Sequence, residues 1–177
     1  MKNTLFAACT AIALAFAAPV MAEKSAGNLV DDGTIATSLK ASLLAEKGVP
    51  SGDVNVEVYK GVVLLSGFVK TQAEKDAAGK VAKTVKDVVS VRNEIAVHPA
   101  TSMGTKLDDT VLVGKVKSAL VDAKDVKSGQ INVEARGGIV QLGGFVTSDK
   151  MKARAIAVAK AVPGVTRVDD ALFVKPE

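Results

Sequence analysis

Hydrophobic and polar positions follow the same order of patterns twice along this chain. Each round begins with apolar residues at every fourth position, which are Ile35, Leu39 and Leu43, then Leu112, Val116 and Leu120. This spacing predicts a helix that buries one stripe of side chains. Alternation follows, with Val54, Val56 and Val58 in the first round and Ile131, Val133 and Ala135 in the second. Alternation predicts a strand with one buried face.

A glycine-containing apolar segment comes next, GVVLLSGFV from Gly61 and GIVQLGGFV from Gly138. Lys60-Gly61 and Gly137-Gly138 are predicted as tight turns that join this second strand to the first in a hairpin. Alternate positions keep their residue type between the two copies, namely Val63, Leu65, Gly67 and Val69 against Val140, Leu142, Gly144 and Val146. This set is predicted to face the core. Gly67 and Gly144 are expected to leave room for a helix packed on the sheet, or to mark a bulge.

A second helix and a third strand complete each round. Thr71-Gln72-Ala73-Glu74 fits a capping box that opens a helix running to about Val85, and Pro163-Gly164 ends its counterpart. Small residues predicted on the buried side are Ala77, Ala78, Val81 and Val85, with Ala155, Val158, Ala159 and Val162 in the second copy. The last strands are expected over residues 88–97 and 165–174.

The two rounds are one internal repeat. Shifting the chain by 77 positions aligns residues 31–99 with residues 108–176 without a gap. A repeat of this length fits two small domains in tandem rather than a solenoid. The predicted fold class is therefore α+β, with two αββαβ domains, each a three-stranded sheet with two helices on one face. The expected boundaries are 31–99 and 108–177, with a flexible lead over 23–30 and a linker over 100–107.

Residues 1–22 have the features of a secretory signal peptide. Lys2 precedes an apolar run over residues 5–18, and Val20 and Ala22 provide the small residues before a cleavage site. We expect cleavage after Ala22. The apolar run is shorter than the roughly 20 residues that a membrane-spanning helix needs. Lipoprotein processing at Cys9 is the weaker alternative, because it would leave too short an apolar region.

The composition of the chain limits the classes of function that it can have. Removal of the signal peptide leaves 22 basic and 19 acidic residues, a net charge of +3, and no cysteine. The charge is too small to indicate nucleic-acid binding, and the absence of cysteine excludes disulfides in the mature chain.

The duplicated strand and the segments after it resemble a known family. GVVLLSGFV with VKDVVSVRNEIAV, and GIVQLGGFV with AVPGVTRVDDALFV, resemble the BON domain. The resemblance covers both repeats. It implies a three-stranded sheet with two helices on one face and, together with the export signal, a place in the periplasm of a Gram-negative bacterium. It also implies a role in osmotic or envelope stress, through contact with phospholipid or as a chaperone. The signature positions are apolar residues and glycines, which specify a fold more strongly than an activity.

Few residues suggest chemistry, so we expect no enzyme, no metal site and no cofactor. The single histidine, His98, stands at the end of a predicted strand and is interpreted as a solvated residue. The acidic pairs 31–32 and 108–109 are placed where helix caps are needed, and 169–170 falls on a predicted strand without calcium-loop spacing. The glycine pairs lack the spacing of a phosphate-binding loop.

A mixed apolar and basic helix face remains as the candidate site. Val113, Lys117, Val121 and Lys124 share one face of the first helix of the second repeat, and Lys40, Leu44 and Lys47 hold the equivalent places in the first. Such a face suits the surface of an anionic phospholipid membrane, although lysine stems covering a core edge explain it as well. The alternative function is a soluble chaperone that binds exported polypeptides through exposed Leu44, Leu64 and Phe173.

Overall fold

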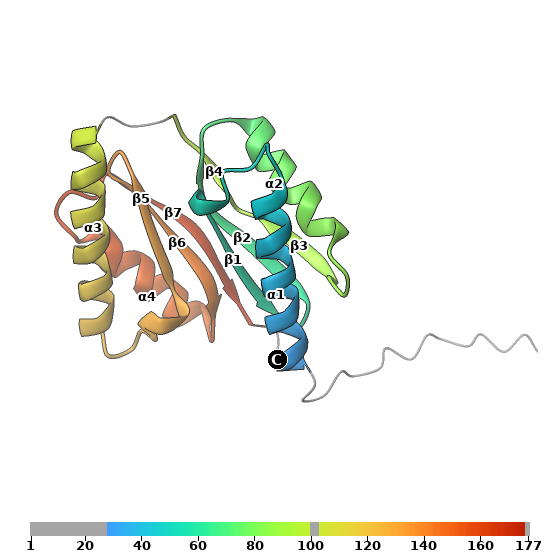
Figure 1. The fold of residues 1–177 in the computed structure, drawn as a ribbon. Helices are drawn as coiled ribbons and strands as arrows, with labels where there is room; N and C mark the ends of the chain where they lie inside the picture. Colours follow the sequence, from blue (N-terminus) through green and yellow to red (C-terminus); the bar gives the residue numbers. More distant parts are fainter. Residues whose placement is uncertain (1–27, 100–102, 176–177) are drawn as a thin grey trace, which may run out of the picture.

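The computed structural model describes residues 28–99 and 103–175 and contains two αββαβ units (Figure 1). The expected signal peptide and its cleavage site after Ala22 lie outside the described residues. The first unit consists of α1 (Asn28–Ala45), β1 (Val54–Tyr59), β2 (Val62–Val69), α2 (Gln72–Thr84), β3 (Ser90–Asn93) and β4 (Ala96–Val97). The second consists of α3 (Met103–Asp122), β5 (Asn132–Arg136), β6 (Ile139–Val146), α4 (Asp149–Lys160) and β7 (Arg167–Val174).

Each sheet has the topology that the sequence pattern predicts. The first hairpin is antiparallel, with Val56 opposite Leu65 in the first unit and Val133 opposite Leu142 in the second. The third strand returns parallel to the middle strand in both units. The predicted α+β fold with two tandem αββαβ domains is confirmed.

Two separate hydrophobic cores lie between the helices and one face of each sheet. The predicted helix stripes are buried, since Leu39 and Val116 have 0% exposure. The alternate positions of the middle strands, Val63, Leu65 and Val69 with Val140, Leu142 and Val146, belong to these cores as expected. Ala78 and Ala82 of α2, and Ala155 and Ala159 of α4, are also fully buried, which lets each helix approach its sheet closely.

One of the predicted helix caps is present in the structure, and two others are not. The capping box at α2 is present, with Thr71 Oγ1 accepting from the Glu74 amide and the Glu74 carboxylate accepting from the Thr71 amide. The acidic pairs, however, do not cap the first helix of either unit. α1 begins at Asn28 and α3 at Met103, so Asp32 and Asp109 lie inside helices.

Those two aspartates bind the hairpin turns instead. The Asp32 carboxylate accepts hydrogen bonds from the Lys60 and Gly61 amides at 2.7 and 2.8 Å. The Asp109 carboxylate accepts from the Gly137 and Gly138 amides at 2.8 and 3.0 Å. All four turn residues have positive φ, between 50° and 79°, so their amides point toward the helix. Each aspartate therefore fixes its first helix to its β-hairpin.

The glycines inside the middle strands have a different role from the predicted one. A Cβ at Gly67 would overlap the carbonyl oxygen of Asp53, and a Cβ at Gly144 would overlap that of Gln130, in the short turns before β1 and β5. Their φ angles are +112° and +142°. The paired residues of the hairpins follow one another without an inserted residue, as far as Gly67 in the first and Gly143 in the second. Glycine is therefore required by a close approach of neighbouring backbone, not by a packed helix.

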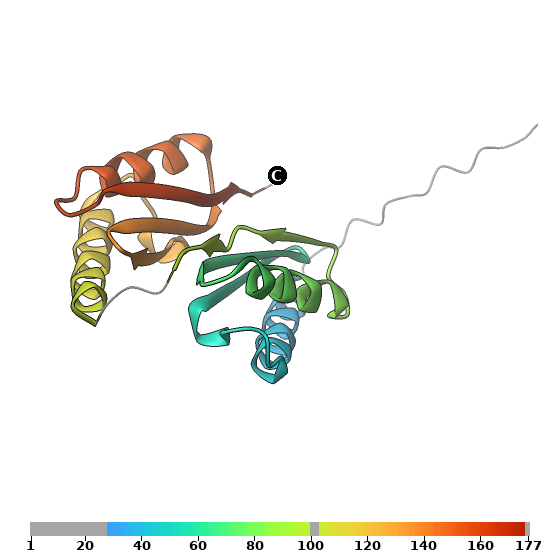
Figure 2. The same cartoon turned by 90° about the horizontal axis from the view of Figure 1, so that it is seen from above.

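The outward face of each sheet is covered as well. Leu64, Ser66 and Phe68 on β2, and Gln141, Gly143 and Phe145 on β6, are all buried, although they point away from their own helices. In Figure 1 the strands of both units lie between α3 on one side and α1 on the other, and Figure 2 shows the same arrangement from above. The two sheets pack against each other and the helices lie on the outside.

Candidate functional site: the docked domains and their helix faces

Equivalent residues of the two domains contact each other reciprocally across the interface. Asn55 donates to Glu134 at 3.3 Å, and Asn132, which is the counterpart of Asn55, donates to Glu57 at 2.8 Å. Glu57 and Glu134 are themselves counterparts in the repeat. Contacts that repeat in this exchanged form are the mark of a two-fold axis. The domains are therefore related by an approximate two-fold axis within one chain.

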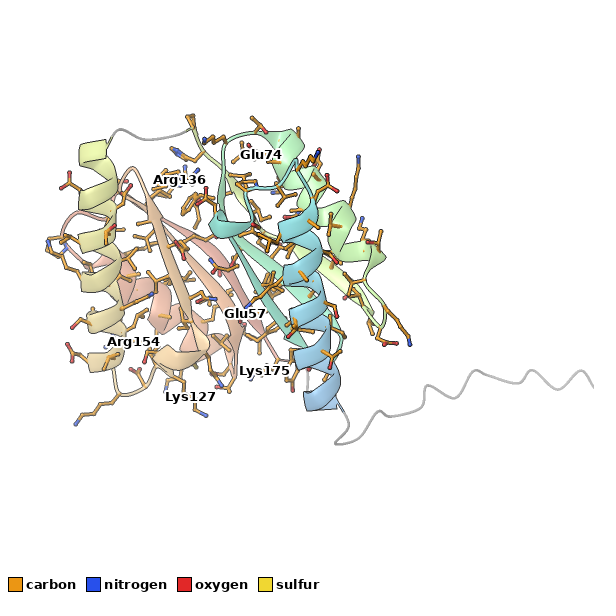
Figure 3. All side chains as sticks on the ribbon, in the orientation of Figure 1. Glu57, Glu74, Lys127, Arg136, Arg154 and Lys175 are labelled. Carbon is orange, nitrogen blue, oxygen red and sulfur yellow. The ribbon has the colours of Figure 1, made fainter. Side chains whose placement is uncertain are left out.

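The two ends of the interface are related by the same symmetry, but different residue types make the contacts at each end. Tyr59 packs on Phe145 with ring centroids 5.7 Å apart, and their counterparts Arg136 and Phe68 form a cation–π contact at 5.6 Å. Arg136 also donates to the His98 carbonyl at 3.2 Å, whereas Lys175, the counterpart of His98, lies over the Tyr59 ring at 5.0 Å. Figure 3 shows Arg136 and Lys175 toward opposite ends of the boundary between the domains, with Glu57 between them.

The axis passes near Ser66 and Gly143, which are counterparts. A Cβ at Gly143 would lie 2.6 Å from Ser66 Oγ and 2.9 Å from Ser66 Cβ. The serine of one sheet therefore occupies space that the glycine of the other leaves free. Alternation along β6 turns Gly143 away from its own core, a position that would accept a larger residue in an isolated domain, but the facing sheet covers it.

Gln141 breaks the symmetry and completes the sheet of the first domain. Its Oε1 accepts a hydrogen bond from the Gly67 amide, and its Nε2 donates to the Glu94 carbonyl at 2.7 Å. Glu94 lies between β3 and β4, where the third strand of the first domain is interrupted. In the second domain the corresponding strand β7 pairs with β6 over its whole length. The glutamine amide thus takes the place of a missing backbone contact between strands.

Glu57 is a partly buried carboxylate at the boundary between the domains. It accepts from Asn132 and from the Phe145 amide, and Lys175 and Lys40 are near it. Burial between the sheets nevertheless raises the pKa of Glu57 above its ordinary 4.5, because the hydrogen bonds and the lysine charges offset the desolvation only in part.

Most of the predicted lipid-binding residues lie on α1 and α3, but these helices end at Ala45 and Asp122, so Lys47 and Lys124 lie in the turns that follow and not on the predicted helix faces. Lys117 and Lys124 are exposed, Val121 is 66% exposed, and Val113 is half-buried against the core. Lys40 and Lys47 are exposed, and Leu44 is 77% exposed. Leu44 and Val121 are counterparts in the repeat. A large apolar side chain that is held in water at the same place in both domains is not needed for either core.

Two grooves lie beside these faces. One, of 430 Å³, runs between α1 and the edge of β1, and Lys40, Leu44 and Asn132 contribute to its wall. The other, of 680 Å³, lies between α3 and α4, with Lys115 and Arg154 among the residues that line its mostly apolar surface.

Three further interpretations from the sequence need correction. Leu64 is 1% exposed because it lies in the interface, so it is not available to a polypeptide partner. Phe173 is half-buried, with Arg92 and Lys152 over its ring at 5.0 and 5.9 Å. His98 is half-buried and stands edge-on to Phe68 at 6.4 Å, so it is not a simply solvated residue.

Other kinds of site are not evident in the part of the chain that the structure describes. Within residues 28–99 and 103–175 no cluster of three or more metal-ligating side chains occurs. None of the helices in the same ranges has the length and apolar character to cross a membrane.

The comparisons with known proteins agree with the repeat. The BON domain family model matches residues 31–99 and again residues 108–176. Osmotically-inducible protein Y of Escherichia coli K12 is 38% identical over 151 residues, which cover 84% of this chain and 75% of that protein. Outer membrane lipoprotein DolP of Haemophilus influenzae is 33% identical over 146 residues, covering 82% of this chain and 75% of that protein.

One solved structure also aligns with both domains, but loosely. It is CdsD, a structural protein of the type III secretion system of Chlamydia trachomatis, with 13% identity and a TM-score of 0.34 over 82% of this chain. The present chain spans 64% of that structure, and at this TM-score the likeness carries no argument about function. The two family matches, the relatives and the fold agree that this chain belongs to the BON-domain family, with two BON domains in tandem.

Proposed function

We propose that the protein is a non-enzymatic periplasmic protein of osmotic or envelope stress that contacts anionic phospholipid at a membrane surface. Its similarity to an osmotically-inducible protein and to an outer membrane lipoprotein supports the cellular setting. The expected signal peptide, cleaved after Ala22, is consistent with export.

The exposed mixed face of α3 is the observation that carries the proposal. Val121 offers aliphatic surface to the headgroup region, while Lys117 and Lys124 meet lipid phosphates. Each lysine contributes about 1 kcal/mol near an anionic surface, so a contact of this kind is weak and reversible. Among the described residues no tryptophan is available to anchor it, and electrostatic attraction must supply much of the affinity.

Vesicle co-sedimentation tests this function. We expect the mature protein to sediment with vesicles that contain phosphatidylglycerol and to remain in solution with phosphatidylcholine alone. Binding should weaken as salt rises, because screening shortens the reach of the lysine charges. Equal binding to both vesicle types, or none to either, would contradict the proposal.

The chaperone alternative makes a different prediction in the same experiment. Apolar contact with an unfolded polypeptide does not weaken with salt, and it needs exposed apolar side chains. Leu44 remains as such a residue, whereas Leu64 is buried in the interface and Phe173 is half-buried. Salt-resistant binding of an unfolded client, without vesicle binding, would favour this alternative.

A further inference from the structure

The approximate two-fold axis has a geometric consequence for the two helix faces. Residues related by a two-fold axis lie at the same height along that axis, on the same side of the molecule. α1 and α3 are related in this way, and Figure 1 shows them running in opposite directions at the two sides of the sheets. Figure 2 shows both helices on the same side of the molecule.

The side chains at the C-terminal ends of these helices, and in the turns that follow, match position by position. Leu44 corresponds to Val121, and Lys47 corresponds to Lys124. All four are exposed, and Leu44 and Val121 are 77% and 66% exposed. Docking therefore brings two small apolar and basic faces to the same side of one rigid body.

From this we infer that the docked domains form one bivalent surface, on which α1 and α3 contact the same anionic membrane at the same time. The inference rests on the proposed lipid contact and adds that the first domain takes part and that docking is required. Two weak sites that are held in a fixed geometry bind one surface far more tightly than either site alone, by roughly 10²-fold or more.

A pair of equivalent double variants tests the participation of both domains. Leu44→Ser/Lys47→Glu removes the face on the first domain, and Val121→Ser/Lys124→Glu removes the face on the second, with the same change in charge. Both sets of residues are exposed, and none of the four side chains takes part in the hydrogen bonds that join the domains, although Leu44 shares a groove wall with Asn132. We expect each variant to lose roughly 10²-fold or more in affinity for phosphatidylglycerol vesicles, because either change abolishes the bivalent contact.

A third variant tests whether docking is needed. Gly143→Val alters neither helix face nor charge, but its side chain overlaps Ser66 and should separate the sheets. We expect its affinity to fall to the level of the single-face variants and its radius of gyration in small-angle X-ray scattering to rise. Adding Ser66→Gly removes the overlapping atoms, so the double variant should regain both the compact form and the affinity.

The outcomes separate this inference from the function on which it rests. If the unaltered protein does not bind the anionic vesicles, the proposed function fails. If it binds, but the change at Leu44 and Lys47 has no effect, or Gly143→Val binds as well as the unaltered protein, then a single domain makes the contact and the bivalent surface is disproved.

Discussion

Single residues that look interchangeable in the sequence have distinct physical tasks in the fold. Asp108 and Asp109 are neighbours, but only Asp109 is buried, where it accepts two amides from the β5–β6 turn. Hydrogen bonds to a charged acceptor contribute about 1.5–3 kcal/mol, so Asp109→Ala should lower the free energy of unfolding by roughly that amount. Asp108→Ala, at an exposed position, is the control. Chemical denaturation of both variants measures the difference, and equal midpoints would refute this role.

The adjacent glycines of β6 form a second contrast at the residue scale. Gly144 has φ +142°, and a Cβ there would overlap the Gln130 carbonyl of its own domain and lie 3.3 Å from the Glu57 carboxylate of the other, whereas a Cβ at Gly143 would meet only Ser66 of the other domain. Gly144→Ala should therefore destabilise the second domain itself, by about 1–3 kcal/mol, through backbone strain. Gly143→Ala should weaken docking and leave the melting of the second domain almost unchanged. Hydrogen exchange in the core of the second domain distinguishes the two, and similar protection in both variants would show that the assigned causes are wrong.

Gln141 is the clearest case at the scale of secondary-structure elements. Gln141→Leu keeps the size of the side chain but leaves the Gly67 amide and the Glu94 carbonyl without their partner. A buried polar group without a partner costs about 1–3 kcal/mol. We expect faster hydrogen exchange at Gly67 and a lower midpoint of unfolding for the first domain, although the substitution is in the second. Unchanged exchange at Gly67 would contradict this role of the glutamine.

The elements themselves could be predicted because the chain contains two copies of one pattern. Ile35, Leu39 and Leu43 follow helical spacing, and Val63 and Leu65 keep their type in the second copy, so the inner faces could be assigned. The outer faces could not, because Leu64 has become Gln141 and Ser66 has become Gly143. Such variation is typical of a solvent-facing side, and it also fits two surfaces that pack against each other. Aromatic Tyr59, Phe68 and Phe145 at outward positions were the available signal of a covered face.

The candidate site was predictable to a similar extent. Helical spacing placed Lys117 and Val121 on one exposed face, as the structure has them, but α3 ends at Asp122, so Lys124 is exposed in the turn beyond the helix and not on its face. The equivalent face of α1 lies on the same side of the molecule only because the domains dock. The hydrophobic periodicity of one domain carries no information about how the two domains dock. The lipid contact itself stays a prediction.

At the scale of the whole molecule, the position of Glu57 links docking to pH. Its pKa in the folded protein is raised above 4.5, so the docked state binds more protons than the unfolded chain as pH rises through this region. The contribution of Glu57 to stability therefore falls as pH increases from about 4.5 through the pKa of the folded protein. Glu57→Gln should remove that part of the decline.

The equivalent residue in the second domain provides the control for this effect. Glu134 pairs with Asn55 but is exposed, so Glu134→Gln removes the same charge without altering the buried carboxylate of Glu57, and the decline that Glu57 causes should persist. Denaturant midpoints measured from acid to neutral pH give both slopes. If the two variants show the same slope, desolvation of Glu57 does not contribute to the pH dependence.

The unequal interface also determines which domains can be neighbours. A chain composed of two second domains would place two Gln141 side-chain amides between sheets whose strands are already fully paired. A chain composed of two first domains would contain two interrupted third strands, with no glutamine amide to bind the Gly67 amide and the Glu94 carbonyl of either. Each homotypic pairing is therefore penalised by unsatisfied polar groups, whereas the mixed pairing satisfies all of them. The repeats are similar in sequence, but their facing surfaces are complementary and not identical. Losing either copy would deprive the other of the partner to which its outer sheet is fitted.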